Sequence, residues 1–234
     1  MQRMSGRIIV ALLLTLAGCL FWLAPRHPTS PLSGKLPMAV AEAVSALQRG
    51  DGPNLASQVA DFAGDRWRLD GLTLVPGAAV APDGSKSAAR LDERSDYGWH
   101  RIEASVHGVT AGTVHTLSLF VKSAGPVLIQ FEMRDANFGK YGVVQYNLQD
   151  RAVVYESGDV DRAGMQALPD GWLRCWAVMP YSSDNAVFNF ALMSRHAERL
   201  YKGNSSTGLL IWGVQFEPGD GPRAYAAAQG SAAR

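Results

Sequence analysis

From residue 54 onward, apolar and polar residues alternate with a period of two, and this alternation constrains the fold more than any other feature. The pattern is clearest at residues 115–122, 127–134 and 144–149. Successive side chains of a β-strand point to opposite faces, so each segment predicts a strand with one face against a core and the other toward water.

Further strands are predicted between clusters of turn-forming residues. They are expected at Trp67–Val75, Ala88–Asp92, Trp99–Val106, Ala152–Glu156, Gly171–Met179, Ala186–Met193 and Leu209–Phe216. Turns such as Pro82-Asp83-Gly84 and Pro169-Asp170-Gly171 separate them, and the chain has 24 Gly and 12 Pro. About ten short strands without a long helix between them predict an all-β protein, an antiparallel β-sandwich.

The N-terminus has the pattern of an export signal. Arg3 and Arg7 precede the apolar stretch of residues 8–17, and Leu16-Ala17-Gly18-Cys19 follows. This tetrapeptide resembles the bacterial lipobox, which implies cleavage after residue 18 and lipidation of Cys19. The apolar run continues to Ala24, so an uncleaved signal anchor remains the alternative. Either reading places the rest of the chain outside the cytoplasm, in the cell envelope; a lipidated chain is expected at the outer membrane, an anchored one at the inner.

The remaining segments divide the chain into a tether, a domain and a tail. Residues 19–53 are expected to form a tether rich in Pro, Ser and Gly, with a short helix at 37–49 between Pro37 and Gly50. The β domain is expected at 54–228 and a disordered tail at 229–234.

Composition and motifs exclude several functions. With 22 Lys+Arg against 21 Asp+Glu, the net charge of +1 gives no basis for nucleic-acid binding. Two Cys cannot form a disulfide framework, and Cys175 is expected to be a buried small apolar residue. No catalytic or nucleotide-binding motif is present, so no enzyme activity, no cofactor and no catalytic metal are expected. His100, His107 and His115 are expected to be exposed on the sheet, and a structural Ca²⁺ held by Asp83 or Glu217 is left open.

Four segments resemble the motifs of one family. They are Ala81–Ser85, Gly112–Lys122, Asp170–Cys175 and Ile211–Glu217. Together they are similar to the carbohydrate-binding-module-like jelly roll found in phage tail fibre proteins and polysaccharide-acting enzymes. The resemblance covers nearly all of residues 54–228 and implies a jelly roll that binds a polysaccharide or oligosaccharide. His115 and Leu173 stand where the family usually has tyrosine.

Aromatic side chains on an outward strand face are candidates for stacking on the apolar face of a sugar ring. In the strand at 171–179, the period of two sends one set of residues inward, namely Leu173, Cys175, Ala177 and Met179. It sends Trp172, Arg174 and Trp176 outward, where they would form a platform. Two further groups are candidates: Tyr97, Trp99 and Arg101 on one strand face, and Phe138 and Tyr141 in a predicted hairpin loop. Trp212 alternates with Leu210, Val214 and Phe216 and is expected in the core.

Three functions remain open. The first is a membrane-tethered, non-catalytic module that recognises a cell-surface or exported polysaccharide. The second is an assembly protein of an envelope or polysaccharide-export complex, in which the jelly roll docks a protein partner. The third is a polysaccharide lyase or hydrolase, which would need two converging carboxylates.

Overall fold

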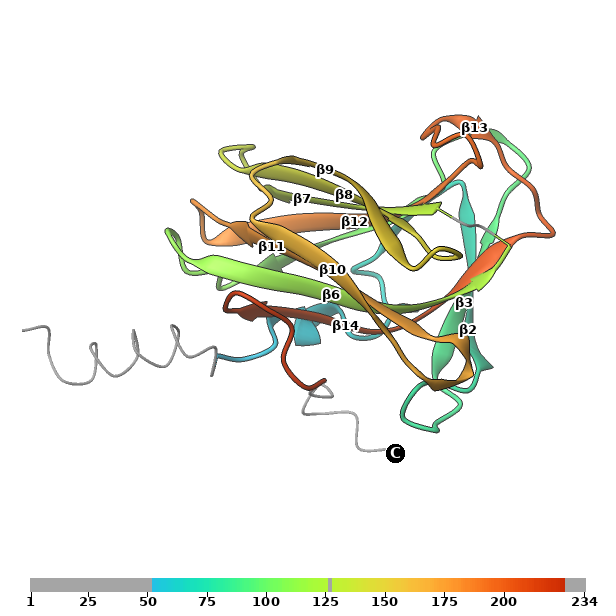
Figure 1. Ribbon diagram of the computed structural model, residues 1–234, viewed down its shortest axis with the longest axis horizontal. Coiled ribbons are helices and arrows are strands. Elements are labelled where there is room, and N and C mark those ends of the chain that lie inside the picture. The colour runs from blue at the N-terminus through green and yellow to red at the C-terminus, as the bar shows by residue number, and fades with distance from the viewer. Residues whose placement is uncertain (1–51, 126–127, 226–234) are drawn as a thin grey trace, which may run out of the picture. The chain divides into compact units, whose positions relative to one another are not determined.

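Two six-stranded antiparallel sheets pack face to face in the computed structural model, which describes residues 52–125 and 128–225 (Figure 1). Sheet A consists, in spatial order, of β1 (Arg68–Asp70), β5 (Arg101–His107), β12 (Asn185–Met193), β7 (Leu128–Asp135), β8 (Tyr141–Asn147) and β9 (Ala152–Gly158). Sheet B consists of β10 (Arg162–Ala167), β11 (Leu173–Pro180), β6 (Val114–Ala124), β14 (Gly208–Pro218), β3 (Ala88–Glu93) and β2 (Leu72–Ala79). The predicted antiparallel β-sandwich is confirmed.

Smaller elements complete the described chain. A two-stranded ribbon pairs β4 (Tyr97–Gly98) with β13 (Tyr201–Lys202), and two short 3₁₀ helices are η1 (Leu55–Val59) and η2 (Pro169–Gly171). Among the described residues, no helix has the length and apolar character needed to cross a membrane. The predicted lipobox with Cys19, the helix at 37–49 and the tail at 229–234 lie outside the described residues.

The core lies between the inner faces of the two sheets, as the period of two predicts. On β11, the four residues expected to point inward all belong to the core cluster, and Cys175 and Ala177 have no exposed surface. Burial raises the pKa of the Cys175 thiol, which therefore stays protonated and behaves as a small apolar side chain. Sheet A contributes aromatic rings, among them Phe131 and Phe190 with ring centroids 4.7 Å apart.

Two glycines change the strand pattern in ways that the period of two does not show. The predicted strand 67–75 breaks at Gly71, which has φ +64°, so β1 joins sheet A whereas β2 joins sheet B. A Cβ on Gly71 would lie 1.9 Å from the carbonyl oxygen of Trp99. Gly213 has φ +61° and lies in a bulge of β14, between Trp212 and Gln215.

The bulge reverses which side chains of β14 face the core. Val214 and Phe216 lie in the main core cluster, whereas Trp212 packs with Phe120 on the opposite, outer face of sheet B. The expectation that Trp212 shares the inner face with Val214 and Phe216 is therefore wrong, although its indole is buried.

Two of the three histidines expected on the surface are buried. His100 contacts the ring of Tyr201, and His115 stacks on Phe216 with centroids 5.0 Å apart. His107 is exposed, as expected. Burial lowers the pKa of His115 to about 4, because removal from water disfavours the imidazolium.

We expect Ala177→Asp to lower the free energy of unfolding by at least about 3 kcal/mol, because it places an unpaired carboxylate in the core of sheet B. Ala167→Asp, on the exposed end of β10, is the matched control and should change stability little. Urea denaturation of both variants measures the difference, and equal losses would show that the β11 faces are assigned wrongly.

We expect stability to fall as the pH drops from about 6.5 toward 4, by up to about 3 kcal/mol from His115 alone. In that window the unfolded chain binds a proton at this imidazole and the folded chain does not. His115→Phe keeps a ring against Phe216 and should flatten the dependence, whereas the exposed His196→Gln should retain it. Denaturation midpoints at pH 7 and pH 4.5 test this, and an unaltered slope in His115→Phe would contradict it.

Candidate functional site

The outer face of β11 is not the exposed platform that the sequence predicts. Trp172 is 3% exposed and packs in a second apolar cluster with Phe120 and Trp212. Tyr225 closes the edge of this cluster, with its ring 4.4 Å from that of Trp212. Trp172 does point away from the main core, but its indole is packed within this second cluster instead of lying exposed.

Arg174 is covered by the chain that follows β14. Its guanidinium donates hydrogen bonds to Ser118 Oγ from Nε and Nη2, at 3.2 and 2.9 Å, and to the carbonyl oxygen of Arg223. Arg223 is itself held by an ion pair with the buried Glu217, 2.7 Å from Nε to Oε2. Burial lowers the pKa of Arg174 from its ordinary value. Of the three predicted platform residues, only Trp176 is half-buried, with its indole against Gly164 on β10.

The outer face of sheet A is lined by polar side chains instead. Strand register places Glu103, Asn189 and Glu132 in one row across β5, β12 and β7. A second row continues the pattern across five strands, with Arg101, Ala191, Gln130, Gln145 and Tyr155. Their neighbours along each strand, such as Ile102, Phe190 and Phe131, lie in the core. We call these two rows the polar face.

Two amide side chains in the polar face are buried without full hydrogen bonding. Asn189 and Gln130 are each 1% exposed. Gln130 Oε1 accepts a hydrogen bond from Gln145 Nε2 at 3.1 Å, but Gln130 Nε2 and Asn189 Oδ1 have no partner among the described residues. Each such atom costs about 1–3 kcal/mol relative to a paired one. The polar face therefore holds one unpaired hydrogen-bond donor, on β7, and one unpaired acceptor, on the adjacent β12.

Aromatic rings border this face on two sides. Trp99 precedes β5, and the guanidinium carbons of Arg101 and Arg199 lie 4.6 and 5.4 Å from its ring centroid. Arg101 also pairs with Asp70, 3.6 Å from Nε to Oδ2. On the other side, Tyr155 of β9 is 49% exposed.

Tyr141 lies one row further along the same face. Burial, together with the neighbouring carboxylate and hydrogen bond of Glu132, raises the pKa of the Tyr141 hydroxyl. Tyr141 pairs across the strands with Arg134, whose guanidinium lies 4.3 Å from the ring centroid of Phe138. Phe138, at φ 58° in the β7–β8 hairpin loop, is 63% exposed.

The structure thus brings together some of the predicted ligand-binding residues and separates others. Trp99, Arg101 and Tyr141 lie at the polar face, with Phe138 at its end. Tyr97 is 74% exposed but belongs to the separate ribbon of β4 and β13. Trp172, Arg174 and Trp176 lie on the outer face of sheet B.

Sequence reasoning missed the centre of the polar face. Gln130 and Glu132 lie on the strand face that the period of two directs toward water, and Asn189 stands between Phe188 and Phe190 as a polar break in an apolar strand. Such a break was the available signal. Arg199 was missed because it reaches the face from a loop after β12.

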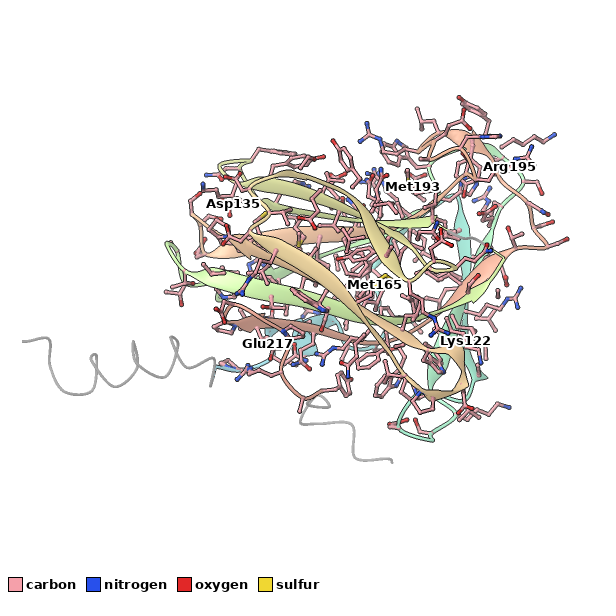
Figure 2. The ribbon with its side chains drawn as sticks, in the orientation of Figure 1. Lys122, Asp135, Met165, Met193, Arg195 and Glu217 are labelled. Carbon is pink, nitrogen blue, oxygen red and sulfur yellow. The ribbon has the colours of Figure 1, made fainter. Side chains whose placement is uncertain are left out.

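That loop is ordered by its own hydrogen bonds. Ser194 Oγ donates to Glu198 Oε2 at 3.0 Å and accepts from the backbone N–H of His196 and Glu198. The loop carries Arg195 (Figure 2) and leads into β13. From this loop, the Arg199 guanidinium lies over the Trp99 ring. Its positive charge also opposes the rise in the pKa of Tyr141.

The carboxylates named as calcium ligands have protein partners. Asp83 Oδ1 accepts from the N–H and hydroxyl of Ser85, and Glu217 accepts from Arg223 and from Gln215 Nε2. Among the described residues, no group of three or more His, Cys, Asp or Glu side chains is arranged to hold a metal ion. A structural calcium stays a prediction from the sequence.

The chain resembles solved structures at low identity. No protein-family model matches it, and no curated protein matches it. TmCBM61 in complex with β-1,4-galactotriose is 11% identical, with a TM-score of 0.42, over 70% of this chain and 97% of that one. The CBM22-1–GH10 modules of Clostridium thermocellum endo-1,4-β-D-xylanase 10B, complexed with xylohexaose, are 15% identical, with a TM-score of 0.36, over 70% and 28%.

A bacteriophage protein is also similar. The enzymatically active domain of bacteriophage CBA120 tailspike protein 4 is 12% identical, with a TM-score of 0.39, over 70% of this chain. This chain spans 20% of the tailspike chain.

We expect Trp172→Ala to lower the free energy of unfolding by about 3–5 kcal/mol, because the indole fills the second apolar cluster. Tyr97→Ala, which truncates an exposed ring, should change it by less than about 0.5 kcal/mol. Chemical denaturation of both variants measures this, and a tolerated Trp172→Ala would restore the exposed platform that the sequence predicts.

Proposed function

We propose that this protein is a non-catalytic glycan-binding module and that the polar face of sheet A contacts the sugar. The observation that carries this proposal is the pair of buried, unpartnered amide atoms, Asn189 Oδ1 and Gln130 Nε2. A buried polar atom without a partner is costly, and a hydroxyl-rich ligand supplies both the missing donor and the missing acceptor.

The surrounding side chains suit the same ligand. Sugar hydroxyls donate to carboxylates such as Glu103 and Glu132, which flank Asn189 in register. The exposed ring of Tyr155 offers an apolar surface to the C–H face of a sugar. The row from Arg101 to Tyr155 crosses five strands, a length that favours a polysaccharide or oligosaccharide over a single sugar unit.

We further propose that the domain is held at a membrane outside the cytoplasm. The support is the sequence pattern at residues 8–19, with lipidation of Cys19 or retention of the apolar segment as the two routes. A ligand of such a module would be a cell-surface or exported polysaccharide.

A second candidate function is glycan hydrolysis, favoured by one observation. Glu103 and Glu132 lie on either side of β12, so their Cα atoms are roughly 9–10 Å apart, twice the strand spacing, and side chains on one face can bring their carboxyl groups closer than this. Inverting glycosidases hold two carboxyl groups roughly 6.5–9.5 Å apart. Release of new reducing ends from a bound polysaccharide, abolished by Glu132→Gln, would establish hydrolysis over binding.

We expect Asn189→Leu to weaken glycan binding by about tenfold or more without loss of stability. The substitution replaces an unpaired buried amide by an apolar side chain of similar size, which removes a cost from the fold but also removes the ligand's partner. The full chain, purified in a non-glycosidic detergent, is applied to a glycan array, and the affinity for each bound glycan is then measured by calorimetry.

Asn185→Leu is the control on the same strand. It removes the hydrogen bond to His107 at the far end of β12 and should leave binding unchanged. Glycan binding that survives Asn189→Leu intact would move the site away from the polar face. A blank array would reject the glycan function and favour the assembly role, in which the domain docks an envelope protein.

A further inference from the structure

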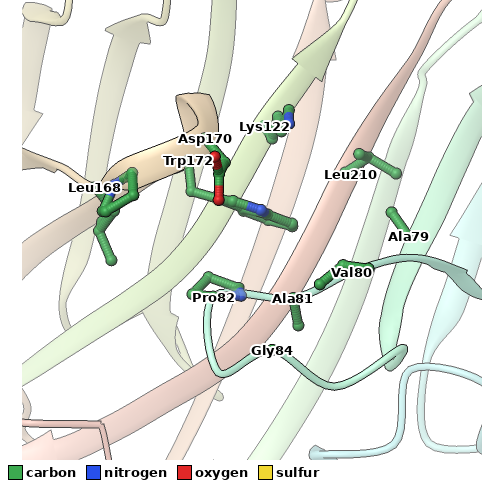
Figure 3. A pocket seen from close by; sticks show the side chains of 11 residues that line it. Ala79, Val80, Ala81, Pro82, Gly84, Lys122, Leu168, Asp170, Trp172 and Leu210 are labelled. Carbon is green, nitrogen blue, oxygen red and sulfur yellow. The ribbon is translucent and has the colours of Figure 1, made fainter.

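A pocket of about 450 Å³ opens on the outer face of sheet B, on the sheet that does not carry the polar face. Two turns of the same composition border it, Pro82-Asp83-Gly84 before β3 and Pro169-Asp170-Gly171 before β11 (Figure 3). Lys122 of β6 and Leu210 of β14, which are cross-strand partners, also line it. Its volume falls within the range of roughly 300–1,000 Å³ that small-molecule sites have.

The pocket holds polar groups that no other described residue engages. Across residues 52–125 and 128–225, the Lys122 ammonium and the Asp170 carboxylate form no ion pair or side-chain hydrogen bond. The indole N–H of Trp172 also has no hydrogen-bond acceptor among these residues, although Trp172 is only 3% exposed. Figure 3 shows the Trp172 ring lying across the pocket, below Lys122 and Asp170.

The rest of the lining is apolar and small. It comprises Ala79, Val80, Ala81, Gly84, Leu168 and the two turn prolines. An apolar ligand would therefore leave a cation, an anion and an indole N–H unpaired, whereas a strongly anionic ligand would meet Asp170 at close range. The equal and opposite charges favour a neutral ligand whose groups both donate and accept hydrogen bonds.

We propose that this pocket binds a single neutral sugar ring, either a free monosaccharide or the terminal unit of a glycan chain. Ring hydroxyls accept from Lys122 Nζ and from Trp172 Nε1 and donate to Asp170, while the C–H face of the ring packs on the apolar wall. This site is separate from the polar face, because Lys122 and Leu210 lie on the outer face of sheet B whereas Val121 and Ile211 next to them lie in the core.

The test uses ligand-observed saturation-transfer NMR on the full chain in a non-glycosidic detergent. The probes are D-glucose, D-galactose, D-mannose and N-acetyl-D-glucosamine, with D-glucuronate and glycine as charged comparisons. We expect transfer to at least one neutral sugar, and we expect Lys122→Met and Asp170→Asn each to lower its affinity by about tenfold or more. Asparagine tolerates the left-handed backbone of Asp170, φ 59°, so that variant should fold normally.

Variants elsewhere separate this site from the polar face. Lys202→Met, on β13, removes an exposed cation far along the chain from the pocket and should change nothing. Asn189→Leu should leave monosaccharide transfer intact even if polysaccharide binding is lost. Transfer that is lost in Asn189→Leu but survives both pocket variants would overturn this inference while supporting the polar face. Absence of transfer to every neutral sugar, or preferential transfer to glycine or D-glucuronate, would also overturn it.

Discussion

The centre of sheet B is buried on both faces, and this constraint determines which surfaces of the domain a ligand can reach. Residues 115–121 of β6 are all buried, although alternate side chains along the strand point to opposite sides. One side meets the core between the sheets, and the other is covered where the chain after β14 folds back. The contact that secures this cover is the network joining Arg174, Ser118, Arg223 and Glu217, in which a buried cation and a buried anion are both hydrogen-bonded. Removal of the Arg223 guanidinium would leave the Glu217 carboxylate buried without its cationic partner, which is strongly destabilising.

Local periodicity was sufficient to predict the strands and the inward face of β11, because both depend on residues two apart in the sequence. It failed where a backbone conformation interrupted the alternation of inward and outward side chains. Gly71 sends consecutive strands into different sheets, and Gly213 inserts the bulge that turns Trp212 outward. The period of two did not predict the short strands β4, β10 and β13. They lack an alternating apolar pattern and form by pairing with a neighbouring strand.

The candidate sites were harder to predict, because they depend on strand register and on packing by residues that are distant in the sequence. A period of two shows that Trp172 and Arg174 point away from the core. It cannot show that Trp172 packs in a second cluster with Tyr225, or that the carbonyl oxygen of Arg223, about fifty residues later, accepts a hydrogen bond from Arg174. Likewise, nothing local places Glu103, Asn189 and Glu132 in one row, since they come from three strands that are far apart in the sequence.

The outer faces of sheet A and sheet B differ in what their unpaired polar groups cost the fold. A stable domain has roughly 5–15 kcal/mol of folding free energy, so two unpaired amides at about 1–3 kcal/mol each take a sizeable share of it. In sheet B, by contrast, the buried Arg174 has a hydrogen-bond partner for each of Nε, Nη1 and Nη2. The side chains of Lys122 and Asp170, which have no protein partner among the described residues, line the pocket, where water can solvate them. A ligand at the proposed polar-face site would therefore pair atoms that the fold leaves unpaired, whereas a ligand at the proposed pocket site would replace water as the partner of its polar groups. We therefore expect a glycan to bind more tightly at the proposed polar-face site than a single sugar ring binds at the proposed pocket site.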